Sequence, residues 1–78
     1  MKVFIHTIDK TLYEGVAPMV SLPATGGEIS VLDKHIPLVT SLASGMVKVH
    51  ENETSSNDFP VTKGFAQVNS DHVIVLLN

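Results

Sequence analysis

The sequence Leu22-Pro-Ala-Thr-Gly-Gly-Glu-Ile-Ser-Val-Leu-Asp-Lys-His-Ile-Pro-Leu-Val-Thr-Ser-Leu42 determines how this chain folds. Pro23 and the pair Gly26-Gly27 indicate a loop, because proline fixes one backbone angle and glycine adopts conformations that other residues resist. Residues 28–31 then alternate polar and apolar, which is the period of a strand with one solvated face and one buried face. The first half of the stretch therefore predicts a turn followed by a strand.

The second half of the stretch predicts another strand. Asp33-Lys34-His35 interrupts the alternation, and Pro37 disfavours a helical conformation at the residue before it. Residues 38–42 are mostly apolar or β-branched, so they favour a strand over a helix. We expect a charged loop held between two strands.

The rest of the chain repeats this pattern of short strands and turns. Residues 2–8 carry apolar side chains on both faces, Pro18 favours an edge strand or a bulge, and residues 73–77 form a continuous apolar run that predicts a strand covered on both faces. The polar segment 51–58 predicts a hairpin tip. No window has a sustained helical period. The prediction is a single all-β domain over residues 1–78, a flattened sandwich or barrel of roughly eight to ten short strands.

Length and composition exclude several classes of protein. The chain has 78 residues, enough for one domain, and no cysteine, which excludes disulfides, thiol catalysis and cysteine-type zinc sites. Its net charge is -3, all five of its basic residues are lysines, and it contains no tryptophan, which argues against nucleic-acid binding. No apolar stretch approaches the roughly 20 residues that span a bilayer, so we expect no membrane insertion.

Residues capable of chemistry are present but scattered. The four histidines lie in separate predicted strands or loops, at positions 6, 35, 50 and 72. No serine lies in a Gly-x-Ser-x-Gly turn, and Gly26-Gly27 precedes a strand rather than the helix N-terminus that would bind phosphate. We expect no catalytic site, no metal and no cofactor.

One set of residues resembles a known family. Gly27-Glu28-Ile29, Val31-Leu32, His35 and Pro37-Leu38-Val39-Thr40 are similar to the N-terminal domain of the epsilon subunit of F-type ATP synthases. Further matching pieces occur in the family's order along the whole chain: Leu12-Tyr13-Glu14-Gly15, Gly45-Met46-Val47-Lys48-Val49, Gly64-Phe65, Val68 and Val73-Ile74-Val75-Leu76. The chain departs from the family at Asp33-Lys34, where Pro-Gly is usual.

The resemblance implies a β-sandwich and a mechanical role. The family's domain is a non-catalytic part of the rotor, in the central stalk, and couples ion-driven rotation of the membrane c-ring to the gamma subunit and thus to ATP synthesis in the catalytic alpha and beta subunits. It implies a peripheral location at the cytoplasmic face of the bacterial inner membrane. The matching residues imply a c-ring contact at Gly27, Glu28 and Ile29 and a gamma contact at His35, Pro37 and Thr40.

Other interpretations remain open from the residues alone. Glu28 also fits a solvated carboxylate at a strand start, and His35 a loop histidine. The chain as a whole also fits a free-standing β-barrel module that binds a small ligand or peptide, or, less well, a small metal-dependent or hydrolytic enzyme. Members of the family commonly continue into a two-helix C-terminal domain. Because the sequence stops at Asn78, we expect that domain to be absent, with no ATP binding and no inhibition by its helices.

Overall fold

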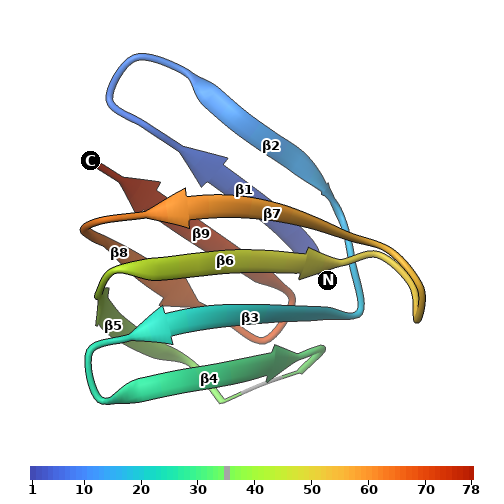
Figure 1. The fold of residues 1–78 in the computed structure, drawn as a ribbon. Helices are drawn as coiled ribbons and strands as arrows, with labels where there is room; N and C mark the ends of the chain where they lie inside the picture. Colours follow the sequence, from blue (N-terminus) through green and yellow to red (C-terminus); the bar gives the residue numbers. More distant parts are fainter. Residues whose placement is uncertain (35) are drawn as a thin grey trace.

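The protein is made of β-strands. The computed structural model describes residues 1–34 and 36–78, and these residues form nine strands and no helix (Figure 1). The prediction of an all-β domain with eight to ten strands is therefore confirmed. The strands are β1 Lys2–His6, β2 Thr11–Val16, β3 Met19–Ala24, β4 Gly27–Leu32, β5 Leu38–Leu42, β6 Gly45–His50, β7 Ser56–Val61, β8 Gly64–Val68 and β9 His72–Leu77.

The strands form two layers that face each other. The front layer in Figure 1 has the order β4-β3-β6-β7, and the back layer has the order β2-β1-β9-β8-β5. The layers are joined where β5 continues through Ala43 and Ser44 into β6, and where Ala24 of β3 pairs with Leu42 of β5. Neighbouring strands are antiparallel except for β1 and β9, which are parallel. The result is a flattened sandwich.

The core lies between the layers and consists mainly of valine side chains. Alternate residues of each strand point inward, as the period of two requires. Burying one such side chain stabilises the fold by about 1.5–3 kcal/mol. The buried hydrophobic residues are Val3, Ile5, Ala17, Val20, Leu22, Val31, Leu42, Val47, Val49, Val61, Ala66, Val68, Val73, Val75 and Leu77.

Two expectations for the N-terminal third of the chain are wrong. Strand β1 ends at His6, because the Thr7 amide donates to the Lys10 carbonyl at 2.8 Å and closes a turn, and this leaves Ile8 97% exposed. Pro18 does not mark an edge strand. It precedes β3, which is paired on both sides, and because Pro18 lies outside the ladder its missing N–H removes no strand hydrogen bond.

The expectations for the second half of the chain are partly correct. The polar segment 51–58 does form a hairpin tip, but its last three residues belong to β7. Strand β9 is covered on only one face. Val73 and Val75 are fully buried, whereas Leu76 on the other face is 51% exposed.

Candidate functional site

The turn between β3 and β4 places Glu28 at one end of the sandwich. Thr25 and Gly26 form the turn, and Ala24 pairs with Gly27 across it. Gly27 has a φ of 127°, a backbone conformation that residues with a Cβ rarely adopt. This explains why glycine occupies the position. Glu28 follows on the edge strand β4. Its exposed side chain has no hydrogen bond or ion pair with the described residues.

Strand β5 lies opposite this turn. The Thr25 amide donates to the Ser41 carbonyl at 3.1 Å, and the Ala43 amide donates to the Pro23 carbonyl at 2.8 Å. These bonds hold β5 beside the turn and leave an open hollow of about 430 Å³ between β4 and β5. Its lining consists of Ala24, Gly26, Gly27, Glu28, Ile29, Leu38, Val39 and Thr40.

The hollow brings together residues that the sequence assigned to two different contacts. Gly27, Glu28 and Ile29 line it together with Thr40, which belongs to the other predicted set. Pro37 is exposed but does not line the hollow. His35 lies outside the described residues.

The predicted charged loop begins after Leu32, at the end of β4 that is far from Gly27. Lys34 has a φ of 63°, and its amide donates to the Ser70 carbonyl at 2.9 Å and to Asp33 Oδ1 at 3.1 Å. Strand β4 separates Lys34 from Gly27. Its six residues span about 17 Å at the usual rise per residue.

The outer surface of the back layer carries an apolar patch that the site prediction did not include. Strand register places Phe4 beside Ile74, and Leu76 beside Phe65. Phe65 is 56% exposed and Leu76 is 51% exposed, while Phe4 and Ile74 are half-buried. We call this patch the outer apolar face; its members are Phe4, Val16, Val39, Phe65, Ile74 and Leu76. The signal in the sequence was the apolar character of both faces in residues 2–8 and 73–77.

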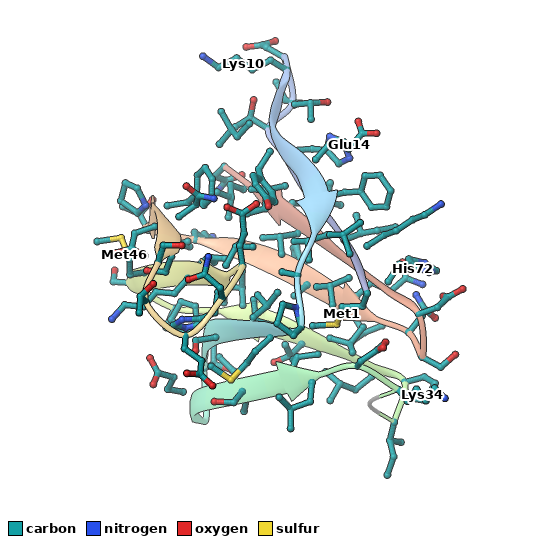
Figure 2. All side chains as sticks on the ribbon, turned by 90° about the vertical axis from the view of Figure 1, so that its right-hand side faces the viewer. Met1, Lys10, Glu14, Lys34, Met46 and His72 are labelled. Atoms are coloured by element: carbon teal, nitrogen blue, oxygen red, sulfur yellow. The ribbon has the colours of Figure 1, made fainter. Side chains whose placement is uncertain are left out.

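The outer surface of the front layer is more polar. Its central row pairs Ser30 with Ser21, Ser21 with Lys48, and Lys48 with Asp58. Figure 2 shows the two outer surfaces on opposite sides, with Met46 on the front layer and His72 and Glu14 on the back layer. Among the described residues, the back layer therefore presents the more apolar of the two outer surfaces, centred on Phe4, Phe65, Ile74 and Leu76 of three neighbouring strands.

Two histidine side chains in the described part of the chain lie within hydrogen-bond distance of a serine or an acidic side chain. Ser21 Oγ lies 3.2 Å from His50 Nε2, but Ser21 is only 6% exposed, so a substrate could not reach its hydroxyl. His72 Nδ1 lies 2.7 Å from Asp71 Oδ1, and this hydrogen bond lowers the pKa of the Asp71 carboxyl.

The described residues contain neither a cluster of metal ligands nor a membrane-spanning helix. Among residues 1–34 and 36–78, no three histidine or acidic side chains are grouped as metal ligands would be. Within the same residues, no helix has the length and apolar character needed to cross a membrane.

Comparison with known proteins identifies similar sequences along the whole chain. Residues 1–78 match the family model described as ATP synthase, Delta/Epsilon chain, beta-sandwich domain. Proteins named ATP synthase epsilon chain from Prochlorococcus marinus strain MIT 9301 and Synechococcus sp. strain CC9902 are 40% and 39% identical to this chain over 70 residues. These alignments cover 90% of this chain and 52% and 51% of the relatives, so the chain spans about half their length.

Two solved structures with the same fold are of ATP synthases. A chain in the mitochondrial ATP synthase of Euglena gracilis superimposes with a TM-score of 0.87 at 22% identity, covering 96% of this chain and 48% of that one. A chain in the central stalk and c-ring structure of the Tetrahymena thermophila enzyme has a TM-score of 0.75 at 19% identity, covering 97% and 61%. At these identities the likeness establishes the fold.

Proposed function

This chain belongs to the ATP synthase delta/epsilon chain β-sandwich family, and from that membership we propose that it is a non-catalytic rotor subunit of an F-type ATP synthase. It couples rotation of the c-ring to the gamma subunit and so to ATP synthesis in the catalytic alpha and beta subunits. The observation that carries this proposal is the family match over all 78 residues. The names of the relatives and the source of the structural neighbours support it.

We propose that gamma packs on the outer apolar face. Exposed apolar surface that is contiguous over several strands is characteristic of protein interfaces, and truncating side chains in such a patch weakens binding. Phe65 and Leu76, which pair with each other and are both more than half exposed, are the expected anchors. His35, Pro37 and Thr40 remain proposed gamma contacts from the sequence resemblance.

The end of the sandwich at Gly27, Glu28 and Ile29 is the proposed c-ring contact. Glu28 supports this assignment because its carboxylate is exposed and has no partner in the described residues, so it is free to pair with a cation on another chain. The proposed anchors of the outer apolar face, Phe65 and Leu76, lie on β8 and β9 of the back layer and do not line the hollow beside Glu28, so one domain can bind both partners at once. Two closely packed layers resist shear, which a part that transmits torque requires.

The proposed location is peripheral, at the cytoplasmic face of the bacterial inner membrane, because the relatives are chains of a membrane-associated ATP synthase. The absence of ATP binding stays a prediction. A module that binds a small ligand is less well supported, because such sites usually bury most of their ligand, whereas the hollow beside Glu28 is open to solvent.

Binding to a purified gamma subunit from the same organism tests the proposal. Calorimetry should detect a one-to-one complex with the unaltered chain. Leu76→Ser should weaken binding about tenfold or more, as expected for an interface anchor. Leu32→Ser is the matched control, since Leu32 is 56% exposed on the opposite outer surface, and it should change the affinity less than twofold.

The results distinguish an error in the proposed rotor function from an error in the proposed gamma-binding face. If the folded, unaltered chain does not bind gamma, the rotor function is wrong. If the chain binds but Leu32→Ser weakens binding as much as Leu76→Ser does, the assignment of the face is wrong. Glu28→Gln should leave gamma binding unchanged and weaken association with a purified c-ring.

A further inference from the structure

The two long sides of the sandwich are closed in different ways. On the β5 side, backbone hydrogen bonds such as that from the Thr25 amide to the Ser41 carbonyl connect the two layers. On the other side lie β2 and β7, which are the first and last strands of the sheet order. No backbone hydrogen bond joins β2 to β7 in the described part of the chain. We call this side the open seam.

Side chains connect the layers across the open seam. Tyr13 Oη on β2 donates a hydrogen bond of 2.8 Å to Glu51 Oε2, just after β6. Asn57 Nδ2 on β7 donates to the other oxygen of the same carboxylate at 2.9 Å. The Tyr13 ring also packs on the ring of Phe59, with centroids 5.7 Å apart and planes inclined by 56°. We call these four residues the seam network.

Gly15 gives the Tyr13 ring the space to reach Glu51. Both residues are on the inward face of β2, where Tyr13 pairs with Ile5 and Gly15 pairs with Val3. A Cβ on Gly15 would lie 2.7 Å from Tyr13 Oη and 2.9 Å from Tyr13 Cζ, closer than nonbonded atoms approach. The ring therefore lies along β2, over the glycine. This gives Tyr13 and Gly15, two residues of the matching piece Leu12-Tyr13-Glu14-Gly15, a shared structural role.

We propose that the open seam is where the sandwich opens and that the seam network is its latch. Edge strands have neighbours on one side only, so β2 and β7 depend on packing between the layers to stay in place. When the Tyr13 to Glu51 bond breaks, the two strands separate, fray from β1 and β6, and expose the Tyr13 and Phe59 rings to water. The open form thus lacks one exposed carboxylate bond, one ring pair and the backbone pairing of the frayed residues.

Amide hydrogen exchange of the folded chain tests the latch. Tyr13→Phe removes the donor and keeps the ring, and it should speed exchange in β2 and β7 about fivefold or more while β8 and β9 stay unchanged. Gly15→Ala should have at least the same effect, because it displaces the ring without changing either bonding partner. Ser56→Ala is the control: it removes a 2.8 Å bond to Asp58 that lies within β7 and does not cross the seam.

The fluorescence of the only tyrosine provides a second measurement. Glu51→Ala should raise the rate of collisional quenching of Tyr13 by acrylamide about twofold, whereas Ser56→Ala should not. Exchange that rises equally in all nine strands, or that does not rise in Tyr13→Phe, would overturn the proposal. Because Tyr13→Phe is a small change, it decides the question even if Gly15→Ala fails to fold. Neither measurement involves gamma or the c-ring, so the result is independent of the proposed rotor function.

Discussion

Gly64 at the start of β8 lies directly against the backbone carbonyl of Leu76 in β9, with no space for a Cβ between them. Gly64 is buried and pairs with Leu77 of β9. The obstacle to any larger residue is backbone, which cannot move aside as a flexible side chain can. Gly64 belongs to the pieces of sequence that match the epsilon family, and its close contact with the Leu76 carbonyl explains why glycine occupies this position.

Gly64→Ala should therefore destabilise the fold by about 1–3 kcal/mol, the usual cost of overpacking. Urea unfolding measures the change. Gly26→Ala is the control, since nothing lies within 4 Å of a Cβ at Gly26, and it should change the free energy of unfolding by less than about 0.5 kcal/mol. Equal effects of the two substitutions would contradict the predicted overlap.

Lys34→Gly should raise the free energy of unfolding by up to about 1 kcal/mol. Lys34 has a left-handed backbone conformation that costs a residue with a Cβ roughly 1–2 kcal/mol, and the greater freedom of glycine in the unfolded chain offsets part of the gain. Lys34→Ala controls for the lost charge and should give no gain. A gain from alanine equal to that from glycine would show that charge, not backbone strain, is responsible.

The free energy of unfolding should fall at high pH because the Tyr13 hydroxyl ionises. Burial raises the pKa of the Tyr13 hydroxyl above its usual value of 10.0, and the hydrogen bond and negative charge of Glu51 raise it further. A raised pKa means that folding favours the protonated form. The stabilisation is complete below the unfolded pKa near 10 and is lost as the pH rises through the higher folded pKa. Unfolding by urea between pH 8 and 11.5 should show a larger loss for the unaltered chain than for Tyr13→Phe. Parallel pH curves would disprove this role.

Leu22→Ala should cost about 2–5 kcal/mol, because Leu22 is fully buried between the layers and its truncation leaves a cavity. A domain of 78 residues has a small margin of stability, so partial unfolding at room temperature is expected. Leu32→Ala, on the exposed surface, should change stability by less than about 0.5 kcal/mol. Thermal unfolding followed by circular dichroism compares the two variants.

Local alternation made much of the fold predictable. Residues 28–31 alternate in sequence, and in β4 the side chains of Ser30 and Val31 are exposed and buried as the alternation required. The predicted strand wrongly included Ile8, because a turn that begins at Thr7 ends the alternation. The hydrogen bond that closes this turn leaves no apolar pattern in the sequence. The pairing partners of each strand are set by contacts distant in sequence, which alternation does not encode.

The same limit applies to the functional residues. Thr40 and Glu28 line the same hollow because β5 of one layer lies beside β4 of the other layer. Tyr13 forms a hydrogen bond with Glu51, which is 38 positions away in the sequence. The outer apolar face was partly predictable, since residues 73–77 are apolar at every position. Its extent was not, because Phe65, Phe4 and Val39 join it through strand order.

The parallel pair of β1 and β9 also governs how the protein reaches its native state. The first strand of the domain can form its hairpin with β2 as soon as both are synthesised, but its other edge is paired only by the domain's last strand. At about 5–20 residues per second, the 66 residues from His6 to His72 take roughly 3–13 s to synthesise. Throughout that time the unpaired backbone edge of β1 is open to pairing with other chains, so the back layer is completed only after almost the entire domain has been made.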